Sequence, residues 1–454
     1  MTTIGTMSQI LGHRARWALR RLRKEVPGAV TAPGSHDDAE IAAMLCELGM
    51  ALVEVEQPTQ VVAARLMTIA KRYTLSDVRV VVLPRVLFIS VGSAGSGVDA
   101  STQSTTQLNL AGRIDDIAEL AEMGAITPAE AIAALREARS MKPRFSPATT
   151  VAGYAITTVG FGMISHPAWS ALSAYAVLGA AVGVVLLLGR PLPSLSGILP
   201  TLAATVVTIL ANGFVHDTNS DDMLRIIGPA LIAILPGIPL TLGAMELASS
   251  SVVAGASRLI YGVVQLMLIV FGVSLGLHIA WHTVSPHAGP TMGPWSFYVA
   301  IVVIAVGLYV HLSAPHGSLV WLIAAVAVAL IGQKIGGLFL SSAHAGAIGA
   351  FLVVPFSTVA SRIKSSPPAI VMMLSAFWAL VPSALSFESL SEAITGGHND
   401  IHVLSVSVAA IFSIALGTLI GWSVFHPGQR RPNAQTAPIA RTADAQVHRP
   451  RWVP

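Results

Sequence analysis

Apolar stretches follow one another along the chain from Thr150 to Phe425, and short polar connections separate them. A helix needs about 20 mostly apolar residues to cross about 30 Å of hydrocarbon. On that basis we expect ten membrane-spanning helices, near 148–165, 168–188, 195–215, 226–243, 258–282, 295–312, 317–334, 337–359, 368–386 and 404–425. Small residues recur within them, as in Gly179-Ala180-Ala181-Val182-Gly183, and allow close helix packing in lipid. The pattern predicts a mainly α-helical membrane bundle.

The second half of this predicted bundle resembles an inverted copy of the first. Leu235-Pro236-Gly237-Ile238-Pro239 lies late in the fourth span, and Val381-Pro382-Ser383-Ala384-Leu385 lies late in the ninth. Five spans separate the two segments, and an odd number of crossings reverses the orientation in the membrane. We therefore predict two inverted five-helix repeats, over residues 148–282 and 295–425, an arrangement that is typical of secondary transporters.

The chain before the first span is more polar and predicts a small cytosolic α/β domain over residues 37–147. We expect helices at 37–56, 59–73 and 113–123, and strands at 78–83 and 86–91 that are buried on both faces. Thr59 is the expected N-cap of its helix, and Thr127-Pro128-Ala129-Glu130 predicts a capping box before a helix to Arg139. The Gly- and Ser-rich residues 92–107 predict a mobile loop.

The two ends of the chain are basic, and the position of the charge sets the expected orientation. Residues 1–36 predict a basic amphipathic helix on an anionic inner leaflet followed by a linker, or alternatively a disordered tail. Residues 426–454 predict a disordered cytosolic tail. The inward connections carry Arg190, Arg258, Arg362, Lys364, Arg430 and Arg431, whereas the outward ones carry Arg225 and Lys334. By the positive-inside rule, both termini are expected in the cytoplasm.

Composition narrows the class of protein. Hydrophobic residues make up 53% of the 454 residues and charged residues 11%, against about 25% charged residues in a soluble protein. The single cysteine, Cys46, excludes a disulfide framework within the chain. The sequence carries no metal-ligand spacing, P-loop, nucleophile elbow or nucleic-acid-binding patch. We therefore predict no metal, no cofactor and no nucleic-acid partner, and a protein that is not an enzyme.

Candidate binding chemistry lies where the predicted spans are interrupted or polar. Prolines remove backbone donors inside lipid, so the freed carbonyls must find a partner or face a cavity. The predicted substrate-binding residues are Pro236, Gly237, Pro239, Pro382, Ser383, Asn212 and Ser341. The candidate proton carriers are His344, which we expect well inside the eighth span, and Asp217 at the edge of the third. The alternatives are a neutral, hydrogen-bonded His344 and a merely solvated Asp217.

Several segments together resemble one family of transporters. They are Pro58-Thr59-Gln60-Val61-Val62, Val80-Val81-Val82-Leu83-Pro84-Arg85 running into Phe88-Ile89-Ser90, Gly124-Ala125-Ile126-Thr127-Pro128-Ala129-Glu130-Ala131, Leu235-Pro236-Gly237-Ile238-Pro239-Leu240 and Val381-Pro382-Ser383. Their order is similar to that in the bacterial threonine/serine exporter (ThrE) family, ten-span secondary exporters with an N-terminal cytosolic domain. The chain departs from the family pattern at Ser383, where glycine is usual, and at Gln57-Pro58.

The resemblance implies export of L-threonine or L-serine across the bacterial cytoplasmic membrane, driven by the proton gradient. Split relatives of the family imply an alternative substrate class, small dicarboxylates such as succinate. Two other functions stay open from the residues alone: a membrane-anchored enzyme that uses the carboxylates of the N-terminal domain, and a sensor whose domain binds a partner. An oligomer is compatible with the sequence.

Overall fold

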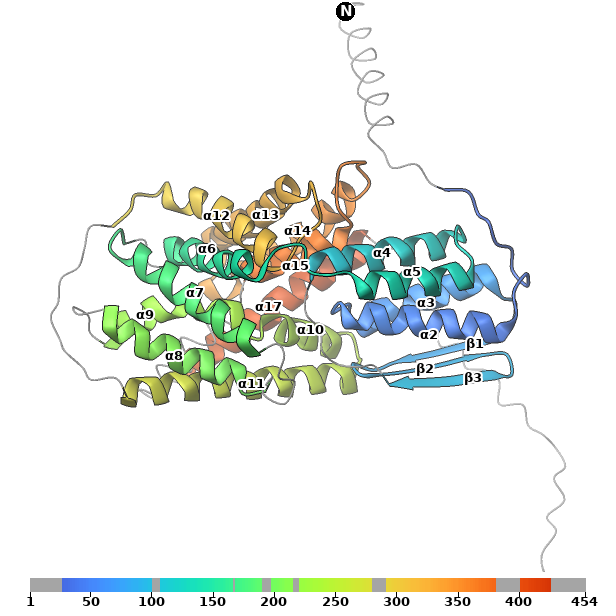
Figure 1. Ribbon diagram of the computed structural model, residues 1–454, viewed down its shortest axis with the longest axis horizontal. Coiled ribbons are helices and arrows are strands. Elements are labelled where there is room, and N and C mark those ends of the chain that lie inside the picture. The colour runs from blue at the N-terminus through green and yellow to red at the C-terminus, as the bar shows by residue number, and fades with distance from the viewer. Residues whose placement is uncertain are drawn as a thin grey trace, which may run out of the picture.

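The computed structural model describes residues 27–99, 107–165, 168–189, 197–214, 220–279, 291–380 and 401–425. An N-terminal domain lies against one end of a helical bundle, and the bundle helices run roughly along the long axis of the molecule (Figure 1). The predictions for the basic helix within residues 1–26 and for the tail at 426–454 lie outside the described residues.

The N-terminal domain consists of helices packed on one face of a small antiparallel sheet. Its elements are α2 (Asp38–Glu54), α3 (Thr59–Tyr73), β1 (Val78–Val82), β2 (Val86–Val91), β3 (Ala94–Asp99), α4 (Leu108–Met123) and α5 (Pro128–Ser140). The strand order is β1-β2-β3, with Val81 opposite Phe88 and Leu87 opposite Val98. Helix α2 lies against β2 and β3.

Two predictions for this sheet were wrong. Residues 94–99, which we expected in a mobile loop, form the edge strand β3. The strands are also buried on one face only: Leu87 and Ile89 are buried, whereas Val81 and Phe88 are about half exposed. An apolar run does not reveal how many of its faces are covered, because helices supply that cover and lie elsewhere in the sequence.

Ion pairs between helices hold the domain together. Arg65 on α3 lies against Asp115 and Glu122 on α4, and its Nε is 2.5 Å from Glu122 Oε1. Burial alone would lower the pKa of Arg65, but the two carboxylates outweigh it and raise that pKa above its ordinary value. Arg139 on α5 contacts Glu47 and Glu54 on α2. The Thr127–Glu130 capping box ahead of α5 is confirmed.

The bundle contains two successive sets of helices. The first is α6 (Pro147–Ser165), α7 (Ala171–Gly189), α8 (Leu199–Phe214), α9 (Ser220–Leu231), the 3-10 turn η2 (Ile232–Ile234), α10 (Gly237–Ala248) and α11 (Val252–Ile279). The second is α12 (Ser296–His311), α13 (Leu319–Phe339), α14 (Ser342–Ala360), α15 (Ala369–Leu380) and α17 (Ile401–Phe425).

Several of these helices suit a membrane by length and composition. Among the described residues, five helices are long and apolar enough to cross it, and a sixth span results if Ile226–Ile234 and Gly237–Ala248, bent by 62°, count as one. Three more apolar helices are shorter, at Leu199–Asn212, Ser296–His311 and Ala369–Leu380. The mainly helical, multi-pass membrane architecture is confirmed, and the number of ten crossings stays a prediction.

The two sets of helices pack in the same order. In the first set α6 contacts α7, α7 contacts α8, and α8 contacts α11; in the second α12 contacts α13, α13 contacts α14, and α14 contacts α17. Glycines at the same spacing lie on the last helix of each set. A Cβ at Gly272 or Gly276 would clash with α8, and one at Gly417 or Gly421 would clash with α14. These glycines allow the close helix approach expected in lipid.

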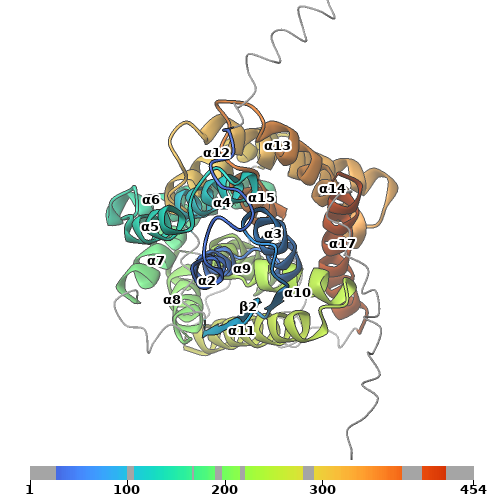
Figure 2. The same ribbon diagram turned by 90° about the vertical axis from the view of Figure 1, so that its right-hand side faces the viewer.

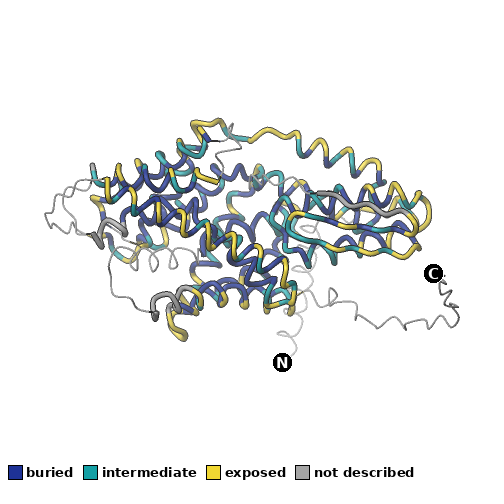
Figure 3. The backbone as a smooth tube through the Cα atoms, turned by 90° about the horizontal axis from the view of Figure 1, so that it is seen from below, coloured by how far each residue is buried: buried dark blue, intermediate teal, exposed yellow. Residues whose placement is uncertain are grey.

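The outer surface of the bundle is apolar. Helix α11 exposes large side chains along its length, among them Ile260, Val264, Met267 and Phe271. Figure 3 shows exposed segments on the outside of the bundle and buried ones toward its interior. A continuous apolar exterior on long helices is the surface that lipid covers.

Candidate functional site

A cavity of about 500 Å³ lies between the N-terminal domain and the bundle. Helices α3 and α4 form its domain wall, and α10, α15 and α17 form its bundle wall. Figure 2, which looks onto the domain end, shows the bundle helices arranged around the domain. The volume falls in the range of about 300–1,000 Å³ that is typical of small-molecule sites.

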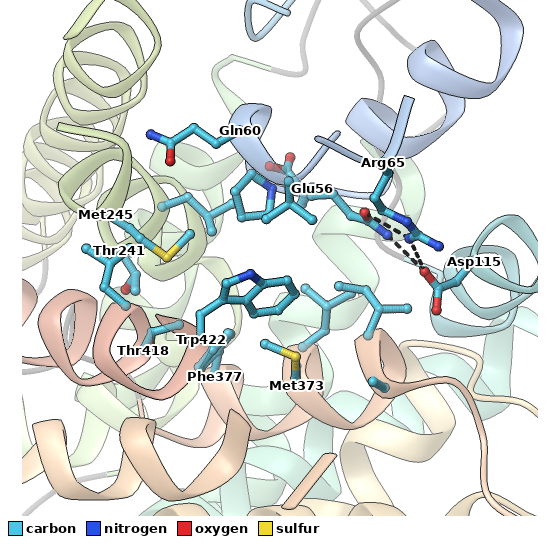
Figure 4. A pocket seen from close by; sticks show the side chains of 18 of the residues that line it. Glu56, Gln60, Arg65, Asp115, Thr241, Met245, Met373, Phe377, Thr418 and Trp422 are labelled. Atoms are coloured by element: carbon cyan, nitrogen blue, oxygen red, sulfur yellow. Dashed lines mark hydrogen bonds and ion pairs between the residues drawn. The ribbon is translucent and has the colours of Figure 1, made fainter. Parts of the chain in front are cut away.

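The domain wall of the cavity is charged. Five carboxylates line the whole cavity, with one guanidinium: Glu56, Asp115, Glu119, Glu122, Glu246 and Arg65. Arg65 is held by Asp115 and Glu122, and it points across the cavity edge toward α4 (Figure 4). The excess of carboxylates gives the cavity a negative potential.

The bundle wall is mostly apolar, with hydroxyl groups from two threonines and three serines. Met245, Met373, Phe377 and Trp422 line it, and the indole of Trp422 faces the domain wall in Figure 4. Thr241 and Thr418 supply two of these hydroxyls and are buried. An apolar wall with a few polar groups is a common design of ligand sites, because polar groups fix orientation while apolar area provides affinity.

The broken helix that we expected at Pro236 reaches this cavity. Helix α9 passes into η2, the chain turns at Leu235 and Pro236, and α10 begins at Gly237. The Gly237 amide donates to the Leu235 carbonyl at 2.8 Å, which closes the turn locally. Gly237 lines the cavity, whereas Pro236 is buried and Pro239 is half buried beside it.

At the other end of α10 a cluster of charged and hydroxyl groups joins the bundle to the domain. We call Glu56, Thr59, Glu246 and Arg258 the interface cluster. Glu246 Oε1 accepts hydrogen bonds from the Thr59 amide and hydroxyl, both at 2.9 Å. Arg258 Nη1 lies 2.7 Å from Glu56 Oε2, and Arg258 Nε lies 3.2 Å from Glu246 Oε2. Glu246 is 1% exposed.

This cluster corrects the prediction that Thr59 is an N-cap. Pro58 occupies the N-cap position, and Thr59 is the first residue of α3. The amide and hydroxyl of Thr59 are satisfied by a carboxylate from α10, 187 residues away. A carboxylate is favourable there because the first turn of a helix leaves amide groups without intrahelical partners.

The other predicted site residues that the structure describes lie away from the cavity. Asn212 lies in the last turn of α8 and is half buried. Ser341 and His344 lie at the start of α14, both exposed, with Ser341 Oγ 2.8 Å from His344 Nδ1. The expectation that His344 lies well inside its span was therefore wrong, because α13 ends at Phe339 and a new helix begins. Asp217, Pro382 and Ser383 lie outside the described residues.

The structure also brings together a second buried polar cluster, which the sequence analysis missed. We call Tyr154, Thr157, His311 and Trp378 the histidine cluster. His311 is 5% exposed, and its ring stacks on Tyr154 with centroids 4.5 Å apart. Its Nδ1 lies 3.2 Å from Thr157 Oγ1 and 3.0 Å from the Gly307 carbonyl.

These contacts fix the tautomer of His311. The Thr157 hydroxyl donates to the Gly153 carbonyl, so its oxygen is left to accept, and the Gly307 carbonyl can only accept. Nδ1 therefore carries the proton when the ring is neutral. A histidine that ends one helix gave no periodic signal in the sequence, and only the packing of α6, α12 and α15 reveals its burial. Within the described ranges, no group of three His, Cys, Asp or Glu side chains could hold a metal ion.

Comparison with known proteins identifies the family to which the chain belongs. A family model described as "Putative threonine/serine exporter" matches residues 43–280, more than half of the chain. No solved structure matches.

Relatives come from yeasts and share the name pheromone-regulated membrane protein 10. That of Debaryomyces hansenii is 27% identical over 229 residues, which is 46% of this chain and 22% of the relative. That of Candida albicans (strain SC5314) is 28% identical over 208 residues, 43% of this chain and 18% of the relative. That of Eremothecium gossypii is 25% identical over 241 residues, which is 50% of this chain and 32% of the relative. The chain thus spans a third or less of the length of these relatives. By the match over residues 43–280, the chain belongs to the threonine/serine exporter family, a family of membrane transporters.

Proposed function

We propose that this protein is a secondary exporter of small hydroxylated amino acids, L-threonine and L-serine. The observation that carries the proposal is the cavity at the domain end of the bundle, which runs along α10 between Glu246 and the helix break at Gly237. At 1.5 Å per residue, these two positions are about 13 Å apart along the helix. A substrate would enter past the charged wall and move toward the break, where the amides of a half-helix favour a carboxylate.

The charge of the cavity favours an amino acid over a dicarboxylate. Five carboxylates and one guanidinium line it, and Arg258 behind them adds a second cation. A net negative mouth attracts an ammonium group and repels a dianion such as succinate. A dicarboxylate, the alternative substrate, would therefore have to enter against the negative potential of the cavity.

The proposed mechanism is alternating access by two inverted repeats. The equivalent packing order of the two helix sets, and the glycine pairs Gly272/Gly276 and Gly417/Gly421, support it. The helix break at Pro236, Gly237 and Pro239 would line the midplane site together with the second break that the sequence predicts at Pro382 and Ser383. Asn212 and Ser341 would contribute at the far end of the bundle.

For the coupling proton we propose His344, Asp217 and His311 as candidates, in a protein of the bacterial cytoplasmic membrane with both termini in the cytoplasm. His344 lies at the start of α14, at the end of the bundle away from the domain, where protons would enter. His311 is a buried imidazole among the membrane helices, and such groups are expensive to bury and commonly functional.

The full-length protein in liposomes tests the proposal. We expect serine and threonine to be transported, faster with an imposed proton gradient, and succinate to be excluded. Thr241→Phe, which fills the cavity, should lower the rate at least tenfold. Val264→Phe adds the same ring on the exposed face of α11 and is the matched control. Transport of none of these substrates by the wild-type protein would refute the proposal and favour the enzyme or sensor alternatives.

A further inference from the structure

The contact between Thr59 and Glu246 has the chemistry of a substrate contact. Threonine and serine carry an ammonium group and a hydroxyl on neighbouring carbons. Thr59 presents a backbone amide and a hydroxyl in the same arrangement, and both donate to Glu246 Oε1 at 2.9 Å. The carboxylate therefore accepts from a threonine already, although this threonine belongs to the chain itself.

We infer that Glu246 recognises the neighbouring amine and hydroxyl of the substrate, and that Thr59 occupies this recognition point in the conformation described. The inference rests on the proposed export of hydroxylated amino acids. Glu246 lies on the cavity wall and on the half-helix α10, so a substrate that reaches the cavity also reaches this carboxylate. Thr59 acts as an internal competitor, and the N-terminal domain must withdraw for the substrate to bind.

The surrounding charges permit such an exchange of partners. Arg258 contacts Glu246 as well as Glu56, so Glu246 still compensates its charge when the domain withdraws with Thr59 and Glu56. A free substrate brings a full positive charge in place of the neutral Thr59 amide, so it adds a Coulomb attraction to the carboxylate that the amide does not supply. The Gln60 side-chain amide, next to Thr59 on α3, donates hydrogen bonds to the Ser249 carbonyl and to Ser251 Oγ just after α10. These neutral hydrogen bonds can break and be replaced by hydrogen bonds to water.

Selectivity for the hydroxyl is the direct test. A site that hydrogen-bonds a substrate hydroxyl rejects the analogue that lacks it, because its buried acceptor is left unpaired. Serine and alanine differ in that hydroxyl alone. We expect wild-type protein in liposomes to have a KM for serine at least tenfold lower than for alanine. Glu246→Gln should raise the KM for serine at least tenfold and bring the ratio of the two KM values close to one.

Matched variants separate recognition from charge and from folding. Glu119→Gln removes a carboxylate from the same cavity without touching Thr59, so it should change both KM values by the same factor. Thr59→Val removes the competing hydroxyl and should lower the KM for serine severalfold, whereas Thr59→Ser should match the wild type.

A second readout does not depend on transport. Serine should accelerate hydrogen exchange of the Thr59 amide in the wild type, alanine should not, and Glu246→Gln should abolish the serine effect. Unchanged serine-over-alanine selectivity in a folded Glu246→Gln variant would overturn the inference, while its transport of serine would leave the proposed function standing. A wild-type protein that transports neither serine nor threonine would instead refute the proposed function.

Discussion

The interface cluster and the histidine cluster are both buried and polar, but they differ in the charge of their groups and in the parts of the molecule that they join. The interface cluster joins two parts of the molecule through charged groups beside a cavity, and its members share partners: Arg258 contacts Glu56 and Glu246. The histidine cluster lies among three packed helices, and its hydrogen bonds join an imidazole, a hydroxyl and a backbone carbonyl.

The helices around the histidine cluster are tightly packed, whereas the interface cluster lies beside a cavity. Beside His311, a Cβ at Gly307 would overlap Thr157, and a Cβ at Gly153 would lie 2.8 Å from the His311 amide. Helices α6 and α12 are therefore in close contact, and they cannot shift without opening voids. The interface cluster can rearrange by exchanging hydrogen-bond partners across a cavity. This contrast suggests that the domain interface moves while the α6–α12 crossing stays fixed.

The largest expected loss of folding stability is at the interface cluster. Arg258→Ala leaves the buried carboxylate of Glu246 without its cation, and removing one partner of a buried pair costs about 3–5 kcal/mol. Thermal or denaturant unfolding of the detergent-solubilised protein measures the loss. The control is Arg79→Ala, since Arg79 and Asp77 form an ion pair that is 82% and 79% exposed and such pairs contribute about 0–1 kcal/mol. Equal losses in the two variants would contradict the burial argument.

The next effect is at the α6–α12 crossing. Gly307→Ala places a methyl group against Thr157 and should destabilise the protein by about 1–3 kcal/mol, the usual cost of overpacking. Gly337→Ala is the matched control on α13, because the nearest atom to its Cβ would be 3.9 Å away. If Gly307→Ala were as stable as Gly337→Ala, the crossing would be looser than the contrast between the clusters requires.

A smaller effect is expected within the histidine cluster itself. Thr157→Val removes an acceptor of the His311 Nδ1 proton but leaves the Gly307 carbonyl 3.0 Å away, so the loss should be about 1 kcal/mol, that of one neutral hydrogen bond. Thr358→Val on α14 is the control, because its hydroxyl donates to its own helix at Val354. The same unfolding measurements compare them, and a loss above that of Arg258→Ala would reverse the ranking of the two clusters.

The smallest effect lies in the domain, far from either cluster, and depends on pH. Hydrogen bonds from the Ser76 and Thr74 hydroxyls lower the pKa of Asp38 below its ordinary value of 3.8. The ionised carboxylate therefore stabilises the folded domain above pH 3.8, and this contribution is lost as the pH falls through the folded-state pKa. Asp38→Asn should speed hydrogen exchange in α2 at neutral pH, with the difference vanishing in acid. A difference that grew in acid would contradict the lowered pKa.

Local sequence signals predicted much of the fold. The capping box at Thr127 and Glu130 was found because its residues are three apart and satisfy each other. The helix at 59–73 matched α3, and the break after Leu235 followed from the missing amides of two prolines. The third strand was missed because Gly95, Ser96 and Gly97 have low strand propensity, which pairing with β2 overrides.

The candidate site could be predicted only in part. Gly237 was expected at a cavity and lines one, but its partners Thr418 and Trp422 come from a helix about 180 positions later, and no periodicity connects them. No sequence pattern marked Glu246 as a site residue, because a single carboxylate near the end of a predicted span is equally common in a solvated loop. His344 was expected deep in the membrane because its depth was inferred from an assumed span boundary, and the start of α14 at Ser342 leaves it exposed.

The sequence by itself determined the membrane class, the approximate positions of most helices and the helix break at Pro236, because hydrophobic length, proline and glycine act on the chain locally. Only the tertiary structure decided which ionisable groups are buried, and which threonine and carboxylate meet across the domain interface. The reason is physical: burial and hydrogen bonding depend on what approaches a residue from elsewhere, and Thr59 and Glu246 are 187 residues apart.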